Sequence, residues 1–268
     1  MKQNIGLILT GGGARAAYQV GVLDAIAQIL REQGWPAQRN PFDIICGTSA
    51  GAINATALAC RADDFGEGIH RLMTVWQNFS VEHVYRADSL GVLRTGARWL
   101  SLLSFGWLLR QWHANPPTSL LDNTPLVTLL HRLLDLERLD KALRNGHLQA
   151  LAVTASSYSS GQHITFYQSE VEIQSWTRSQ RRAIRDQISV QHLLASSALP
   201  FIFPAMPIYC EGRREYFGDG AMRQLAPISP AIHLGATKVV VVGMSRATAA
   251  STDLPVLNCY PSLAQIAG

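Results

Sequence analysis

The chain has 268 residues, of which 47% are hydrophobic and only 16% are charged. This balance excludes a disordered chain and suits one large globular domain or two small ones. The net charge is +4, and because the excess is small and scattered we predict no nucleic-acid partner. The densest basic run, residues 178–185, contains four arginines. We interpret it as the solvated face of a helix, with an anion-binding site as the alternative.

The cysteines form no C-x-x-C pair and no cluster with histidine at metal-ligand spacing. We predict that they are reduced, mostly buried thiols in a cytoplasmic protein without a metal site. The N-terminus enters a glycine loop after a short apolar run, which makes it a poor signal peptide. Because no run of about 18 apolar residues occurs, any membrane contact is predicted to be peripheral. The cysteines are Cys46, Cys60, Cys210 and Cys259.

Residues 5–62 are predicted to alternate between strand and helix. Ile5–Thr10 is apolar and indicates a buried first strand. A helix is predicted over 16–33 from apolar residues at helical spacing, and a second strand over 42–46. The resulting β-α-β-α unit predicts an α/β fold with a parallel sheet and right-handed crossovers.

A sharp turn after the second predicted strand carries a candidate nucleophile. The sequence Gly47-Thr48-Ser49-Ala50-Gly51 has the pattern G-x-S-x-G between a strand and an Ala-rich helix, which is typical of a nucleophile elbow. Glycine at both flanks avoids the clashes that a Cβ would cause in a tight turn. The serine then also lies over the positive end of a helix dipole. The alternative is a Gly/Ser turn that only caps a helix.

Residues 63–145 are predicted to form a helical insertion or cap, with helical patterns at 66–79 and 125–143. The run Trp99–Leu109 between them is apolar nearly all round and is flanked by arginines. It is interpreted either as a buried helix or as an exposed lid that contacts a membrane peripherally.

After residue 145 the sheet is predicted to resume. Strands are expected at 149–155 and 163–167, and helices at 189–198 and 229–234. Two further elements are an acidic turn at 216–221 and a fully buried strand at 238–243. Residues 262–268 resemble the start of another helix, so we interpret the chain as the front part of something longer.

A serine nucleophile needs donors for the oxyanion that its attack creates. Gly11, Gly12 and Gly13 lie between a strand and a helix N-terminus, so their N–H groups can turn toward a cavity. Arg15 would fix this loop or add positive charge. The loop also matches the dinucleotide-binding fingerprint, but that fold requires an acidic residue where the second strand here ends in residues 47–49. A nucleotide-binding α/β module is therefore the less favoured alternative.

Two residues are candidates for the base. His233 is the one histidine that follows Asp219, as a Ser-acid-His order requires, but its place in a helix before a buried strand favours a structural role. Asp219 lies between two glycines in an otherwise apolar turn. A carboxylate is a weak base toward a hydroxyl unless the site is dry and the contact is direct. A Ser-Asp dyad therefore predicts a buried carboxylate that touches Ser49.

Three motifs, in this order, resemble those of the patatin-like phospholipase family: Gly11–Arg15, Gly47–Gly51 and Asp219–Ala221. Segments 18–23, 195–200 and 226–231 also resemble the family, so the likeness spans about residues 5–245. It implies a three-layer α/β/α sandwich with a mostly parallel central sheet. It also implies that residues 1–268 form a single catalytic domain that hydrolyses lipid acyl esters without a metal or organic cofactor.

The resemblance assigns a role to each matching residue. Ser49 would be the nucleophile and Asp219 the base. Ala16 departs from the family, which has glycine there, and this leaves open a lipid-binding or regulatory protein with weak or no turnover. The remaining matches are the oxyanion loop Gly11, Gly12, Gly13 and Arg15, the elbow residues Gly47, Thr48, Ala50 and Gly51, and the acid turn Gly220 and Ala221.

Overall fold

The computed structural model describes residues 3–80, 119, 121–222 and 228–243. The apolar run Trp99–Leu109, with its predicted membrane contact, lies outside these residues, as do Cys259 and the helix predicted at 262–268. These three stay predictions.

The centre of the sheet is parallel, as the β-α-β-α pattern predicts. Strand β1 (Ile5–Leu9) lies between β2 (Ile44–Thr48) and β9 (Lys238–Val242), and β2 pairs in parallel with β3 (Ala150–Ser157). Because the strands are parallel, their carboxyl ends meet at one edge of the sheet, which is where ligands bind in open α/β sheets.

The sheet continues beyond β3 with antiparallel neighbours. Strand β4 (His163–Ser169) pairs antiparallel with β3 and parallel with β6 (Arg181–Arg185), and the two-residue β5 (Thr177–Arg178) follows at the margin. Strand β8 (Arg213–Asp219) pairs antiparallel with the end of β3 and with β7 (Met206–Cys210). The β7–β8 hairpin thereby brings residue 219 to the carboxyl end of the central strands.

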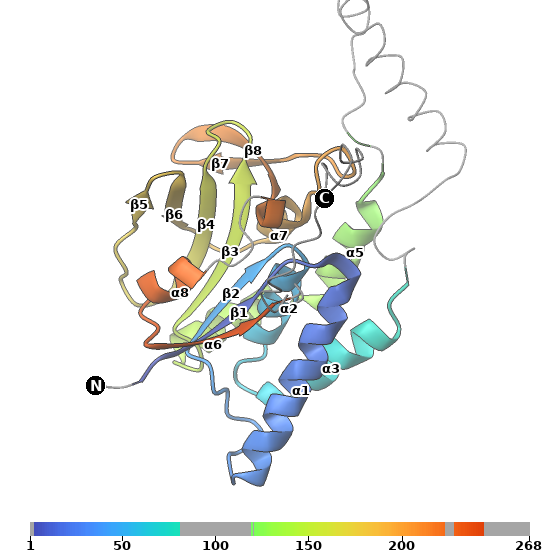
Figure 1. Cartoon of the computed structure of the whole chain (residues 1–268), viewed down its shortest axis with the longest axis vertical. Coiled ribbons are helices and arrows are strands. Elements are labelled where there is room, and N and C mark those ends of the chain that lie inside the picture. The colour runs from blue at the N-terminus through green and yellow to red at the C-terminus, as the bar shows by residue number, and fades with distance from the viewer. Residues whose placement is uncertain (1–2, 81–118, 120, 223–227, 244–268) are drawn as a thin grey trace, which may run out of the picture.

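Helices cover both faces of the sheet and make it the middle of three layers. In β1, Leu7 and Leu9 contribute to the large apolar core under most of the helices, and Ile8 contributes to a smaller cluster beneath α8. Helices α1 and α3 lie side by side, away from α8 (Figure 1). Burial of both faces explains why these strands are continuous apolar runs. The helices are α1 (Ala17–Glu32), α2 (Ala50–Ala59), α3 (Phe65–Gln77), α5 (Thr124–Leu133), α6 (Leu136–Arg144), α7 (Val190–Ser197) and α8 (Ile228–His233).

The cysteines within the described residues are buried and free, as predicted. Cys46, Cys60 and Cys210 are the three concerned. Burial raises the pKa of the Cys46 and Cys60 thiols to about 12, so both are protonated and unreactive at neutral pH.

Five predicted elements differ from the structure. The arginine-rich run is not a helix: β5 and β6 occupy it, because Ala183 and Ile184 are buried in the sheet while Arg181 and Arg185 are exposed. Strand β9 is not fully buried: among the described residues it pairs with β1 alone, and Val241 is 42% exposed. The pattern at 125–143 is two helices, since Leu134 is extended and Asp135 caps α6.

The fourth difference concerns the acidic segment at 216–221. It is an extended strand as far as Asp219, and the turn begins only at the short 3-10 helix Gly220–Met222. The second strand is also shifted: it runs to Thr48 rather than to residue 46. Both shifts have one cause, because pairing with β3 holds the backbone extended further than the local sequence indicates.

Close backbone contacts require glycine on both sides of the elbow. A Cβ on Gly51 would lie 2.3 Å from the Leu9 carbonyl oxygen, and one on Gly47 would lie 2.5 Å from the Ala52 Cα. Both distances are far below van der Waals contact, and the atoms concerned are backbone atoms that cannot move aside. Helix α2 can therefore lie against β1 and β2 only with glycine at these positions.

We expect Gly51→Ala to lower the free energy of unfolding by about 1–3 kcal/mol or more, as overpacking does. Gly21→Ala in α1 is the matched control, because its Cβ would meet nothing within 4 Å. The control should be unchanged or stabilised by up to about 1 kcal/mol. Urea denaturation of both variants measures the difference, and equal stabilities would contradict the packing described here.

Candidate active site

Ser49 lies at the junction between a strand and a helix. Strand β2 ends at Thr48 and α2 begins at Ala50, and Ser49 joins them with φ 55° and ψ −132°. A positive φ is costly for a residue with a Cβ and persists only where the surroundings hold it, which happens most often at functional sites. The side chain is 7% exposed. This is the strand–turn–helix context that the G-x-S-x-G pattern predicts.

Asp219 meets Ser49 from the opposite direction. The Ser49 hydroxyl donates a hydrogen bond of 2.7 Å to Asp219 Oδ2. The other carboxylate oxygen, Oδ1, accepts a 2.7 Å bond from the backbone N–H of Ala221. The backbone N–H of Asp219 also donates to the Ala198 carbonyl at 2.8 Å. Hydrogen bonds therefore hold both the backbone and the side chain of Asp219 in place. The geometry is the direct contact that a Ser-Asp dyad requires.

Burial changes the acidity of this carboxyl group. Asp219 is 2% exposed, and the loss of water around the charged form raises its pKa. The hydrogen bonds from Ser49 and from Ala221 stabilise the charged form and oppose part of the rise. Asp219 is therefore a stronger base than an aspartate in water. The cause is burial, which is the dry environment that a carboxylate base requires.

Ser196 holds the backbone of Ser49, a contact that the sequence did not indicate. Its hydroxyl accepts a 2.8 Å bond from the Ser49 N–H and donates a 2.7 Å bond to the Thr154 carbonyl. Ser196 thereby ties the elbow to β3 through α7. The only sequence signal was its place in segment 195–200, which resembles the family without indicating this contact.

The glycine loop lies against the dyad. A Cβ on Gly11 would lie 2.7 Å from the Ala221 Cβ and 3.0 Å from the Ser49 Cβ, so only glycine fits between these two residues. Gly13 has φ 56°, which glycine adopts without strain. The side chain of Arg15 is exposed, and its backbone N–H donates to the Gly12 carbonyl at 3.2 Å. In the described chain, the Gly12 and Gly13 N–H groups have no hydrogen-bond acceptor.

The acid turn also depends on a close approach. A Cβ on Gly220 would lie 2.3 Å from the Thr154 carbonyl oxygen and 2.9 Å from the Thr48 Cγ2. Glycine at this position allows β8 to end against β3 and against the last residue of β2, which leads into the elbow. The sequence predicted this glycine as part of the acid turn, and its physical role is to let Asp219 reach Ser49.

An apolar cavity of about 410 Å³ opens beside Ser49. Its walls are almost entirely hydrocarbon, and Gly13, Ala14 and Ser49 are among the residues that line it. This volume is within the range of small-molecule binding sites. The apolar walls come from α2, α3, α5 and the segment after α7: Ile53, Leu72, Val75, Trp76, Phe79, Leu126, Leu129, Leu133, Leu199, Ile202 and Phe203.

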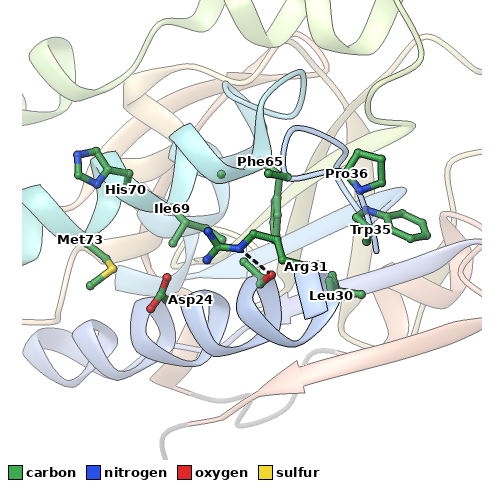
Figure 2. A pocket seen from close by; sticks show the side chains of 12 residues that line it. Asp24, Leu30, Arg31, Trp35, Pro36, Phe65, Ile69, His70 and Met73 are labelled. Atoms are coloured by element: carbon green, nitrogen blue, oxygen red, sulfur yellow. Dashed lines mark hydrogen bonds between the residues drawn. The ribbon is translucent and has the colours of Figure 1, made fainter. Parts of the chain in front are cut away.

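A second cavity, of about 160 Å³, lies between α1 and α3 (Figure 2). It shares no residue with the first cavity. Arg31 is one of the residues that line it, and the Arg31 Nε donates to the Ala27 carbonyl of the same helix at 3.2 Å (Figure 2). Ser49 and Asp219 are not among its lining residues, whereas Ser49 lines the first cavity.

Other candidate groups are placed elsewhere. His233 stacks on Trp176 with the ring centroids 4.7 Å apart, which fits the structural role predicted for it. Across the described segments, no three His, Cys, Asp or Glu side chains are grouped so as to hold a metal ion. None of the helices in those segments has both the length and the apolar character needed to cross a bilayer.

A model of the patatin-like phospholipase family matches residues 7–232. The chain belongs to this family. The match extends over most of the chain and includes the glycine loop, the elbow and the acid turn. Membership agrees with the three-layer α/β/α fold that the three sequence motifs imply.

Similar proteins match over parts of their length. An uncharacterized Escherichia coli protein, YjjU, is 32% identical over 113 residues, which are 42% of this chain and 26% of that protein. Lysophospholipase nte1 of Aspergillus terreus is 48% identical over 61 residues, 23% of this chain and 3% of that protein. The chain thus spans about a quarter or less of these curated relatives.

Two bacterial proteins of known structure are also similar. The crystal structure of VipD from Legionella pneumophila is 17% identical with a TM-score of 0.44, and the match covers 84% of this chain and 47% of that one. The type III effector ExoU of Pseudomonas aeruginosa is 19% identical with a TM-score of 0.29, over 61% and 35% of the two chains.

The raised pKa of Asp219 gives a pH-dependent stability. A carboxyl group whose pKa is higher in the folded state favours folding when protonated and loses that contribution as pH rises through its folded pKa. We therefore expect Asp219→Asn to be more stable than the wild type at pH 7, with the advantage shrinking as pH falls toward the ordinary aspartate pKa.

Urea denaturation at pH 7 and at pH 5 measures this difference. Asp24→Asn serves as the control, because Asp24 is partly exposed and bonds only to the exposed Gln28 side chain in the described structure. An Asp219→Asn protein that is equally or less stable than the wild type at pH 7 would contradict the burial argument.

Proposed function

We propose that the chain is a serine lipid acyl hydrolase of the phospholipase A or esterase type. The observation that carries this proposal is the 2.7 Å bond between two buried side chains, Ser49 and Asp219, beside an apolar cavity. Family membership supports the same class of substrate. The acyl ester would enter the cavity with its carbonyl carbon next to the Ser49 hydroxyl.

The first step acylates the serine. Ser49 Oγ attacks the carbonyl carbon while Asp219 accepts the hydroxyl proton. Backbone N–H groups of Gly11, Gly12 and Gly13 stabilise the oxyanion, with Arg15 adding positive charge beside the loop. The tetrahedral intermediate then collapses: the bond to the alcohol breaks, and Asp219 returns the proton to the leaving oxygen. The products are the free alcohol and an acyl group on Ser49.

The second step hydrolyses the acyl group. A water molecule takes the place of the alcohol and gives its proton to Asp219 as its oxygen attacks the acyl carbon. The same N–H groups stabilise the second oxyanion. Collapse of this intermediate releases the fatty acid, and the proton on Asp219 returns to the Ser49 oxygen. In this scheme Asp219 both accepts and returns the proton in each step, and no cofactor is needed.

The apolar cavity supports an acyl chain as the bound part of the substrate. Its walls are almost entirely hydrocarbon, and Ser49 is one of the few polar residues that line it. Each methylene buried there would contribute about 0.8 kcal/mol. A cavity of about 410 Å³ accommodates one chain, whereas a soluble polar ester would gain little from it.

The dyad predicts the effect of removing each member. We expect Ser49→Ala to abolish hydrolysis of p-nitrophenyl and phospholipid esters, because the acyl group has no other acceptor. Asp219→Asn should lower kcat by about 10²–10⁴, the usual contribution of a general base. In the wild type, activity should fall as pH drops through the raised pKa of Asp219, because the protonated form cannot accept the serine proton.

Ester hydrolysis by the purified proteins, together with fluorophosphonate labelling followed by mass spectrometry, tests this scheme. Label should appear on Ser49, and Asp24→Asn should retain wild-type rates. Equal rates in the wild type, Ser49→Ala and Asp219→Asn would refute a Ser-Asp mechanism.

The cavity predicts a chain-length effect. Leu129 lies on its wall in α5, so Leu129→Trp would fill part of the space. We expect kcat/KM for long-chain esters to fall at least about tenfold, since losing even two buried methylenes costs about 1.6 kcal/mol. Butyrate esters should change by less than about threefold.

Thr128→Trp is the matched control, because Thr128 is exposed on the same helix and does not line the cavity. Steady-state kinetics on p-nitrophenyl esters of increasing chain length measure both variants. Parallel losses at every chain length in Leu129→Trp would show that the cavity does not hold the acyl chain.

A further inference from the structure

Two buried amides lie behind the glycine loop and take no part in the steps above. Gln19 in α1 and Asn54 in α2 are each 0% exposed. A buried amide is costly unless its donors and acceptor are satisfied. Each amide must therefore have hydrogen-bond partners inside the protein, and these include backbone carbonyls at the two ends of the glycine loop.

The two amides hold opposite ends of the loop. The Gln19 Nε2 donates a 2.7 Å bond to the carbonyl of Thr10, the residue before the glycines. The Asn54 Nδ2 donates a 3.1 Å bond to the carbonyl of Ala16, the last residue of the 3-10 turn after the glycines. The Asn54 Nδ2 also donates to the Gln19 Oε1 at 3.0 Å. The amides thus form a clamp across residues 10–16.

The clamp is fully satisfied and reaches the wall of the apolar cavity. The second Gln19 donor contacts the Val242 carbonyl at 3.4 Å, and the Asn54 Oδ1 accepts a 2.9 Å bond from the Trp76 indole N–H. Trp76 and Asn54 both line the cavity. Every donor and acceptor of the two amides has a partner, so losing one of them leaves another buried group unsatisfied.

We propose that Gln19 and Asn54 are positioning residues that set the place of the glycine-loop N–H groups relative to Ser49, with Trp76 securing Asn54 from the cavity wall. This inference rests on the proposed function, because it concerns the oxyanion donors of that reaction. The loop needs such a clamp since three consecutive glycines have little conformational preference of their own. A misplacement of about 1 Å in a catalytic group can cost about 100-fold in rate.

The test compares two substitutions of the same kind. Gln19→Met keeps the length of the side chain and removes its hydrogen bonds. Gln149→Met is the matched control, because the Gln149 Nε2 also donates to a backbone carbonyl, that of Leu234 at 2.9 Å, and its Oε1 accepts from Asn4. Gln149 precedes β3 at the end of the sheet opposite to Ser49. Both variants lose a structural amide, but only one of the two amides lies beside the loop.

We expect Gln19→Met to lower kcat for a p-nitrophenyl ester by about 10- to 100-fold, with KM within about threefold because the acyl cavity is intact. The rate of fluorophosphonate labelling should fall by a similar factor, since the phosphoryl oxygen uses the same donors. Gln149→Met should stay within about twofold of the wild type in both assays. Melting temperatures show whether the two variants lost comparable stability.

A second variant keeps the test informative if Gln19→Met does not fold. Trp76→Phe keeps an aromatic ring on the cavity wall and removes only the N–H donor to Asn54, so kcat and the labelling rate should fall together by a smaller factor. Unchanged kcat in folded Gln19→Met, or in Trp76→Phe where Gln19→Met does not fold, would overturn the clamp while leaving the dyad in place. A wild type that neither hydrolyses esters nor is labelled would instead refute the proposed function.

Discussion

The hydrogen bond between Ser49 and Asp219 joins side chains 170 residues apart in the sequence, and much of the architecture serves to make it. Ser49 is delivered by β2 and Asp219 by β8, and these strands pair one after the other along the same edge of β3, with Thr48 opposite Thr154 and Asp219 opposite Ala155. The bond has a cost, because it takes a carboxylate out of water and raises its pKa. A fold that maintains such a contact must recover that cost in the large core beneath the sheet.

The close approach of backbone segments makes the contact geometrically attainable. Gly47 and Gly51 allow α2 to start directly against β1 and β2, and Gly220 allows β8 to end against β3. Gly11 brings the oxyanion loop to the same point. Each glycine removes one side chain from a place where two backbones meet. The apolar strands supply stability, and the glycines decide how closely the functional groups converge.

The sequence predicted the elements that depend on local pattern. The first strand, the helix after it and the elbow were predictable because apolar periodicity and G-x-S-x-G report local geometry. The arginine-rich run was misassigned because its strand form depends on burial of Ala183 and Ile184 against distant parts of the sheet. The full burial predicted for β9 was wrong, because a run of valines indicates a strand but does not show which neighbours cover it.

The site shows the same division. Motif order pointed to Ser49, Asp219 and the glycine loop, because each motif is short and contiguous. Ser196, Gln19 and Asn54 carry no such signal, since each matters only through a partner far away in the sequence. Side chains that hold a reacting group by a single hydrogen bond can be found only once the fold brings both partners together.

The bond from Ser49 N–H to Ser196 has a stereochemical consequence. Because that N–H is occupied, the backbone amide of Ser49 is not free for an oxyanion, and the proposal assigns the donor role to the glycine loop after β1. Under the proposed mechanism, Asp219 at the end of β8 and the N–H donors after β1 have fixed positions around the reacting carbon. An ester carbonyl can present only one of its two faces to the serine oxygen. The tetrahedral intermediate would therefore form with a single handedness, so that the enzyme would discriminate between mirror-image phosphonates whose chirality lies at phosphorus.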